Sequence, residues 1–157
     1  MKSLIQLLTG AALLALVSSH AWSAEEKIDA DKLPPKVKET LKGKFPGAKV
    51  TSAIKETENN EVIYDVEMTV GGKKHEMDCK EDGTIINFEN EIAVKDLPKA
   101  VADAVKAKHP DATIKEAMET MVIKDGKDTV DEYEVLIVTG DKKEVELTVS
   151  PDGKKIE

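Results

Sequence analysis

Apolar and polar residues alternate along two neighbouring stretches in the first half of the chain. Every second residue from Val62 to Val70 is apolar, and the alternation resumes from His75 to Cys79 after the pair Gly71-Gly72. A period of two residues is typical of β-strands that bury one face. A Gly-Gly pair between two such runs is typical of a tight turn. The pattern therefore predicts an antiparallel β-hairpin.

A different spacing precedes these strands. Val37, Leu41 and Phe45 lie four residues apart, which places their side chains on one face of a helix. Pro46 follows at once and ends the pattern, because proline cannot continue a helix. The spacing predicts a short amphipathic helix over residues 33–44.

The same order of patterns occurs twice along the chain. The stretch from Leu33 to Ile86 matches the stretch from Leu97 to Ile156, from a Leu-Pro pair near the start to an Asp-Gly pair near the end. The second copy again opens with a helical spacing, alternates around Tyr133, and returns through Val145 to Val149. Each copy is predicted to be one supersecondary unit, a short helix followed by about four antiparallel strands.

The repeat sets the expected domain organisation. We expect an α+β fold of two tandem units, with repeat 1 over residues 25–88, a linker over residues 89–96 and repeat 2 over residues 97–157. A unit of about 60 residues buries little surface by itself and is only marginally stable. The two units are therefore expected to pack together over one shared core.

The first 24 residues have the build of a secretory signal peptide. Lys2 is followed by an apolar run from Leu4 to Val17 and then by small residues from Ala21 to Ala24. The apolar run is too short to cross a bilayer comfortably. We expect cleavage somewhere from Ala21 to Ala24, export to the periplasm or beyond, and no stable membrane insertion afterwards. A retained N-terminal anchor is the alternative.

Composition narrows the class of partner. The chain has 23 basic and 31 acidic residues and a net charge of −8, and every basic residue is a lysine. Without arginine, the chain lacks the planar group that favours phosphate and guanine recognition. A nucleic acid is therefore a poor candidate partner for this anionic chain.

The sequence gives little support for a catalytic serine or for a zinc site. The segment His75 to Cys79 begins like the zinc protease motif HExxH, but it ends in cysteine and alternates as a strand. Strand positions four apart lie about 13 Å from each other, too far to share one zinc ion. Ser52 and Ser150, the serines after the leader, lie in no nucleophile-elbow pattern. We expect no catalytic site, and a carboxylate pair that nothing singles out stays open as an alternative.

A candidate metal site lies in the second copy. Four acidic residues gather near a predicted turn: Asp125, Asp128, Asp131 and Glu132. Carboxylate oxygens on a flexible loop suit calcium, although the spacing departs from that of an EF-hand loop. A solvated turn is the commoner interpretation. Carboxylates on the outward faces of the strands are expected to serve solubility.

The recurring motifs resemble those of the PepSY-like family, which is also described as beta-lactamase-inhibitor-like. The motifs are the Leu-Pro start, the helix stop Phe-Pro-Gly-Ala or His-Pro-Asp-Ala, the tyrosine-containing strand, a Gly-Lys turn and the Asp-Gly turn. They cover Leu33 to Ile86 and Leu97 to Ile156. The resemblance implies exported bacterial proteins whose helices cover one face of an antiparallel sheet, with the other face or the hairpin loops free for a partner.

By analogy with that family, we expect a non-enzymatic binding protein whose partner is an exported peptidase or hydrolase. The expected contact surface is the open sheet face with two hairpin tips, which can enter a cleft without costly ordering. The tip residues are Gly71, Gly72 and Lys73 in the first copy and Gly140, Asp141 and Lys142 in the second. The alternative is a calcium or small-ligand sensor that uses the acidic turn, and no cofactor other than calcium is expected.

Overall fold

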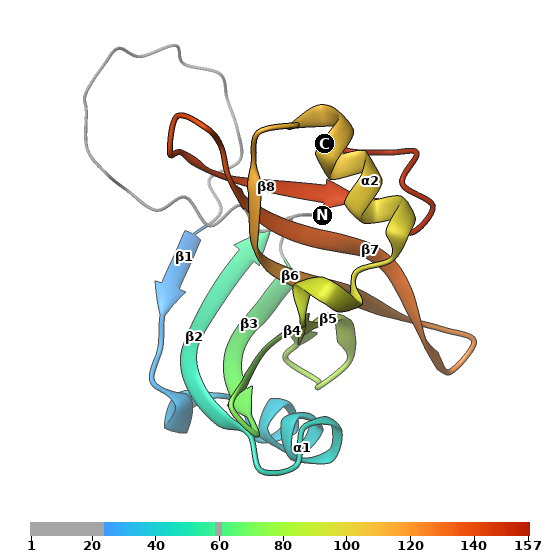
Figure 1. Ribbon diagram of the computed structural model, residues 1–157. Coiled ribbons are helices and arrows are strands. Elements are labelled where there is room, and N and C mark those ends of the chain that lie inside the picture. Colours follow the sequence, from blue (N-terminus) through green and yellow to red (C-terminus); the bar gives the residue numbers. More distant parts are fainter. Residues whose placement is uncertain (1–23, 59–60) are drawn as a thin grey trace.

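The computed structural model describes residues 24–58 and 61–157 (Figure 1). The expected signal peptide lies outside the described residues, apart from Ala24. None of the helices in the described ranges is long and apolar enough to cross a membrane.

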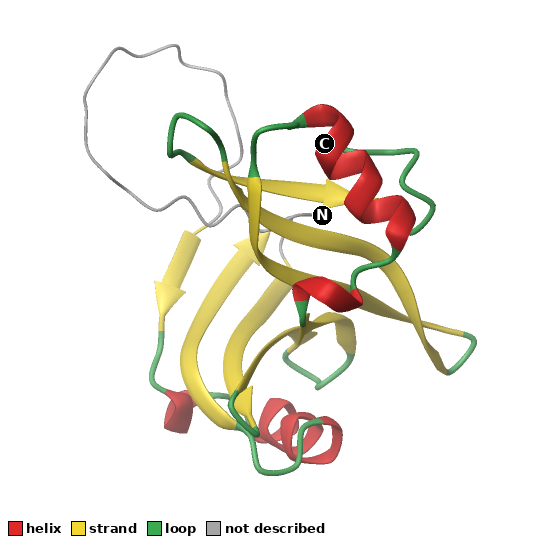
Figure 2. Ribbon diagram, in the orientation of Figure 1, coloured by secondary structure: helices red, strands yellow, loops and turns green. Residues whose placement is uncertain are grey.

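One antiparallel sheet of eight strands forms the body of the protein, and the order of the strands in the sheet is their order in the chain. The strands are β1 (Ala24–Lys27), β2 (Lys49–Glu58), β3 (Glu61–Val70), β4 (Lys73–Lys80), β5 (Ile85–Ile92), β6 (Thr113–Lys124), β7 (Lys127–Val138) and β8 (Glu144–Val149). Two α-helices, α1 (Pro35–Lys44) and α2 (Lys99–Lys108), and two short 3₁₀ helices, η1 (Ala30–Lys32) and η2 (Val94–Asp96), complete the described elements (Figure 2). The expected α+β class is confirmed.

Each α-helix begins and ends where the prolines predict. Pro35 occupies the first turn of α1, where its missing N–H has no intrahelical partner to lose. The backbone N–H of Phe45 donates to the carbonyl oxygen of Leu41 (2.8 Å) and closes the last turn. His109 closes α2 in the same way through the carbonyl oxygen of Val105 (2.8 Å). The two copies therefore build their helices from the same local rules.

The buried side chains form two clusters, one beneath each helix. The first joins Val37 and Leu41 of α1 to alternating residues of β3 and β4, among them Val66 and Met77, which are fully buried. A second, separate cluster joins the apolar face of α2 to β7 and β8. The single shared core expected from the sequence is not confirmed. Each half of the sheet is instead covered by its own helix.

The two halves are joined along the sheet. The residues expected to form a linker continue β5 through Ile92 and then turn through η2 into α2. β5 pairs with β6, with Phe88 opposite Met121 and Ile92 opposite Ala117. The second copy contributes three strands, and Ile156 adds only an isolated bridge to Val149 where a fourth strand was expected.

Candidate functional site: an acidic hollow on the open sheet face

The alternation of side chains assigns a different chemistry to each face of the sheet. On β3, Tyr64 and Val66 belong to the cluster beneath α1, so Asp65 and Glu67 lie on the opposite face. On β4, Met77 faces the helix in the same way. Both buried clusters lie on the side of the sheet that carries the helices. We call the other side the open face.

The open face is hollowed across strands β3 to β8. The hollow has a volume of about 690 Å³. Among the described residues that line it, ten are Asp or Glu and one, Lys74, is a lysine. The acidic residues are Glu67, Glu76, Asp78, Glu89, Glu116, Asp131, Glu132, Glu134, Glu144 and Glu146. We call this feature the acidic hollow.

The strand register places carboxylates opposite one another. Glu76 on β4 lies opposite Glu67 on β3 and opposite Glu89 on β5. One row further along, Asp65 lies opposite Asp78. The Cβ atoms of such cross-strand pairs are about 4.5–5.5 Å apart, and like charges at that distance destabilise the sheet. The register therefore disfavours full ionisation of this face.

Burial adds to this repulsion and raises the carboxyl pKa values. It raises the pKa of Glu89 to about 8, with the nearby charge of Glu76 as the next cause. It raises the pKa of Glu134 to about 9, with Glu89 as the next cause. Burial also raises the pKa of Glu76 and of Asp78. Near neutral pH the acidic hollow therefore holds protons that exposed carboxylates would have released.

Asp65 lies deepest among these acids. Its side chain is only 2% exposed, and neither carboxyl oxygen has a hydrogen-bond donor within reach. Burial, followed by the charge of Glu76, raises the pKa of Asp65 to about 9. Asp65 therefore keeps its proton near neutral pH, where an exposed aspartate would have lost it. This arrangement avoids two neighbouring buried charges.

A second unsatisfied polar group lies in the hollow itself. Thr120 on β6 is 6% exposed, and its hydroxyl Oγ1 has no hydrogen-bond partner. The register places Thr120 opposite Glu89 on β5 and opposite Glu132 on β7. A buried hydroxyl without a partner costs stability. It also leaves one donor and one acceptor available to a molecule in the hollow.

Apolar side chains separate the carboxylates. Met118, Val122 and Leu136 line the hollow together with Ile86. Met118 is 8% exposed and lies opposite Glu134 on β7, on the open face. The hollow therefore offers apolar contact surface as well as negative charge.

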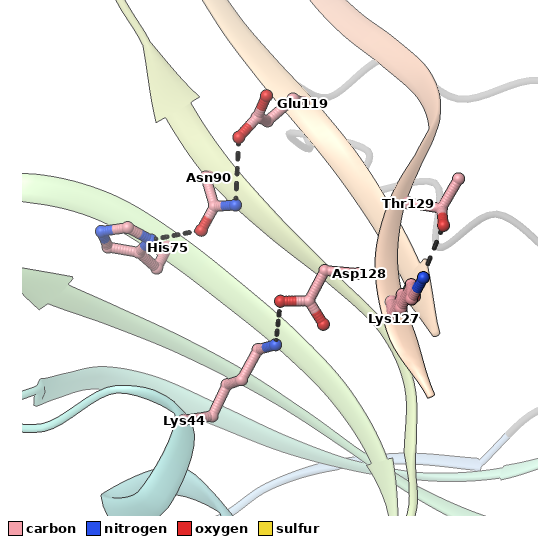
Figure 3. Close-up of polar contacts among 7 residues, drawn as sticks. All are labelled: Lys44, His75, Asn90, Glu119, Lys127, Asp128 and Thr129. Atoms are coloured by element: carbon pink, nitrogen blue, oxygen red, sulfur yellow. Dashed lines mark hydrogen bonds and ion pairs between the residues drawn. The ribbon is translucent and has the colours of Figure 1, made fainter. Parts of the chain in front are cut away.

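The four acidic residues that the sequence suggested as a metal site do not come together in the structure. Asp128 accepts a hydrogen bond from Lys44 Nζ of α1 (2.6 Å), as Figure 3 shows. Asp131 accepts one from Lys124 Nζ (2.9 Å) and, like Glu132, lines the acidic hollow. Asp125 lies in the turn between β6 and β7 with a φ of 53°. The four side chains have different neighbours.

The described ranges contain no group of side chains that could form a metal centre. Within residues 24–58 and 61–157, no three His, Cys, Asp or Glu side chains are placed to hold one metal ion. His75 donates from Nδ1 to Asn90 Oδ1 (2.9 Å), and Asn90 Nδ2 donates to Glu119 Oε1 (3.3 Å) on β6 (Figure 3). Cys79 is fully buried in the first cluster. These two residues of the HExxH-like segment therefore have structural partners, as the strand interpretation predicts.

The two predicted hairpin tips are exposed turns at the ends of strands that border the hollow. Gly71 and Gly72 have φ values of 60° and 88° between β3 and β4. The second tip, residues 140–142, joins β7 to β8 and contains Lys142 with a φ of 65°. Lys74 and Glu144, which line the acidic hollow, follow these tips closely. The role of the tips in binding stays a prediction.

The outward carboxylates, expected from the sequence to serve solubility, line the acidic hollow instead, and no sequence motif predicted that hollow. A signal was present, because acids recur two residues apart on several strands, as in Asp65 with Glu67 and Glu76 with Asp78. Such spacing places both acids on one face of a strand. Only the register between strands shows that these pairs meet across the sheet.

Comparisons with known proteins identify the fold. No family model matches the chain, and no curated protein matches it in sequence. A solved structure of a DUF2874 family protein from Bacteroides uniformis is similar, with a TM-score of 0.58, 13% identity, and coverage of 79% of this chain and 88% of that one. A protein from Bacteroides eggerthii, provisionally described as periplasmic, has the same TM-score and identity, with coverage of 79% and 87%.

A third solved structure is a BLIP-like protein from Bacteroides fragilis. Its TM-score is 0.54 and its identity 21%, with coverage of 82% of this chain and 89% of that one. The PepSY-like resemblance stays a prediction, since no family model supports it. The likenesses show that this chain has the fold of a BLIP-like protein.

Proposed function

We propose that this chain is an exported, non-enzymatic binding protein that holds a protein partner against the open face of its sheet. The observation that carries this proposal is the acidic hollow, which lies on the face that neither helix covers. Its volume of about 690 Å³ falls within the range of about 300–1,000 Å³ that is typical of binding sites. The proposed partner is an exported peptidase or hydrolase.

A resemblance in sequence motifs and a likeness in fold support this proposal. The repeated motifs resemble those of the PepSY-like family, which includes inhibitor-like proteins, and a BLIP-like protein shares the fold. Export to the periplasm agrees with the leader-like residues 1–24 and with the provisional periplasmic description of the Bacteroides eggerthii protein. The hairpin tips at residues 71–73 and 140–142 would extend the contact beyond the hollow.

Capture of a partner by variants that obstruct the open face tests this function. The chain from Glu25 to Glu157 would be immobilised and used to capture proteins from an exported-protein extract of the source bacterium. The variant Glu132→Trp places a large side chain in the half-buried rim of the hollow, and Lys106→Trp places the same side chain on the exposed surface of α2. A hydrolase captured by the wild type and by Lys106→Trp, but not by Glu132→Trp, would support the proposal.

The tips are tested in the same assay. The double variant Lys73→Gln and Lys142→Asn removes both tip charges while keeping the turns, because asparagine tolerates the positive φ of residue 142. Weaker capture by this variant would assign the tips to the contact. Equal capture by the wild type and by Glu132→Trp would place the contact elsewhere and overturn the proposed use of the open face.

A further inference from the structure

We propose that the acidic hollow is a subsite for a lysine or arginine side chain that the protein partner presents. This inference rests on the proposed function of the open face, and it adds the chemistry that the partner must carry. The inference comes from three features of the hollow: its excess of acidic groups, the buried hydroxyl of Thr120 that has no partner, and its apolar side chains.

Acidic side chains far outnumber basic ones in the hollow, although Asp131 is paired with Lys124 and Asp78 accepts a hydrogen bond from Asn87. Among its described lining residues, ten carboxyl groups face one lysine. The lysine side chain, Lys74, lowers the pKa of Glu76 and of Glu89 only in opposition to larger effects that raise them. Glu76, Glu89 and Glu134 take part in none of the ion pairs within residues 24–58 and 61–157. A cation from outside would supply the missing charge.

The carboxylates converge instead of being scattered. Glu76 lies opposite Glu89 in the register between β4 and β5. Glu134 lies on β7, yet the charges of Glu89 and Glu146 act on its carboxyl group. These acids therefore surround one region near Thr120, whose hydroxyl lies buried and without a partner. An ammonium group carries three donors and a guanidinium five, so either could engage the hydroxyl and two carboxylates together.

The apolar residues of the hollow suit the stem of such a side chain. Met118 and Leu136 lie between the acidic rows. Lysine and arginine place their methylene groups along apolar surface while their charged ends reach polar partners. A calcium ion would use none of this apolar surface and needs six to eight oxygen ligands at about 2.3–2.6 Å. No such group of acids is placed for a metal in the described part of the chain.

A bound cation must also displace protons. The titratable groups that line the hollow come from every strand between β3 and β8, and they are Glu67, Lys74, Glu76, Asp78, Glu89, Glu116, Asp131, Glu132, Glu134, Glu144 and Glu146. The buried carboxyl group of Asp65 is close enough to Glu76, Asp78 and Glu67 for their charges to raise its pKa. Burial and mutual repulsion raise the pKa of several of these acids, so the empty hollow holds protons near neutral pH. A cation favours the ionised carboxylates and releases those protons. Affinity is therefore expected to fall as the pH falls.

Calorimetric titration with a defined probe tests the inference. The probe is a lysine-rich peptide with blocked ends, and its control is the same peptide with every lysine acetylated. Titrations in two buffers of different ionisation enthalpy, at about pH 8, measure proton release directly. We expect the lysine peptide to bind with release of protons, and the acetylated peptide not to bind.

Charge-matched variants separate the hollow from general attraction to an anionic protein. The hollow variant carries Glu76→Gln, Glu89→Gln and Glu134→Gln, where glutamine has the shape of a protonated glutamate. The control carries Glu39→Gln, Asp96→Asn and Asp103→Asn, which remove three exposed charges outside the hollow. The hollow variant should bind about tenfold more weakly or worse and release no protons, while the control keeps most of its affinity.

Each remaining outcome is decisive. Equal weakening in both variants would mean nonspecific attraction and would overturn the inference. Binding of spermine but not of the peptide would assign the hollow to a free polyamine and would also overturn it. A hydrolase captured equally well by the wild type and the hollow variant would contradict this inference while leaving the proposed function intact. Peptide binding by a chain that captures no protein would contradict the proposed function alone.

Discussion

The hydroxyl of Thr40 donates a hydrogen bond to the carbonyl oxygen of Gly83 (2.8 Å) and ties α1 to the turn between β4 and β5. Gly83 has a φ of 85°, and a Cβ atom there would lie 2.9 Å from the carbonyl oxygen of Lys36. The second copy repeats this contact, because a Cβ atom on Gly153 would overlap the carbonyl oxygen of Ala100. Close packing of turn and helix therefore explains why the Asp-Gly pair recurs.

Alanine at either glycine should destabilise the fold. The variants Gly83→Ala and Gly153→Ala introduce both a strained positive φ and a steric overlap, and each should lower the free energy of unfolding by about 1–3 kcal/mol. Urea denaturation measures the change. Gly43→Ala in α1 is the control, since a Cβ atom there meets nothing within 4 Å, and it should raise stability by about 0.5–1 kcal/mol. Unchanged stability of Gly83→Ala would contradict the packing explanation.

Two separate clusters imply independent energetic effects in the two halves. Val37→Ala and Val101→Ala each truncate a fully buried side chain on a different helix and should each cost about 2 kcal/mol. Their effects should add to within about 0.5 kcal/mol, because the residues share no partners. Denaturation of the single and double variants measures this. The comparison is the double variant Val37→Ala and Met77→Ala, whose effects should not add because both residues belong to the first cluster. Effects of Val37→Ala and Val101→Ala that strongly departed from additivity would indicate a shared core.

The buried carboxyl groups make the folded protein less stable as the pH rises. The pKa of Asp65 and of Glu134 is raised to about 9 and that of Glu89 to about 8, whereas such groups titrate near about 4 in an unfolded chain. The folded state therefore binds more protons between about pH 4 and about pH 9, and its stability declines across that interval. We expect the thermal midpoint to be higher at about pH 5 than at about pH 9. A midpoint that rises with pH would contradict these shifts.

Asp65→Asn should remove part of that pH dependence. The neutral amide has no charge to bury, so the variant should gain stability relative to the wild type at about pH 9 and little at about pH 5. The size of the gain should be on the order of a few kcal/mol, since one pKa unit corresponds to about 1.4 kcal/mol. Asp103→Asn on the exposed surface of α2 is the control and should leave the slope unchanged.

Cys79 should be chemically inert in the folded protein. Its side chain is fully buried, and burial raises the pKa of its thiol to about 12, so thiolate is scarce. An alkylating reagent should label the denatured chain quickly and the native chain only as fast as the protein opens. Mass spectrometry of timed samples measures both rates. Rapid labelling under native conditions would place Cys79 at an accessible position.

Much of the fold could be predicted because local patterns determine it. Val37 and Leu41 lie on the buried face of α1, and Tyr64, Val66 and Met68 lie on the buried face of β3, as their spacing indicates. Pairing between the copies could not be predicted in this way. The segment around Glu89 mixes charged and apolar residues and has no glycine or proline to mark where a strand ends. Its place within β5 depends on pairing with β6, whose residues are distant in the sequence.

The site was less predictable than the fold for a related reason. Spacing alone places Glu76 and Asp78 on one face of a strand, and that face could equally have been solvated. Whether a carboxylate is exposed or buried depends on neighbours that the strand register brings near it, as Glu76 and Glu146 lie near Glu89. Conversely, Asp128 appeared as a metal candidate because its partner Lys44 is 84 residues away.

The strand order has a consequence for how the chain folds. Each strand of the sheet pairs with the strands next to it in the chain. Most of these pairings close short hairpin loops with a small entropy cost, and the β1–β2 and β5–β6 pairings close longer loops that contain α1 and α2. A chain that lengthens from its N-terminus can add each new strand to an existing edge. The strands β2 to β5 and α1 already contain nearly all of the first buried cluster. The first half could therefore bury its apolar residues before the second half is available, and then serve as the template on which β6 pairs.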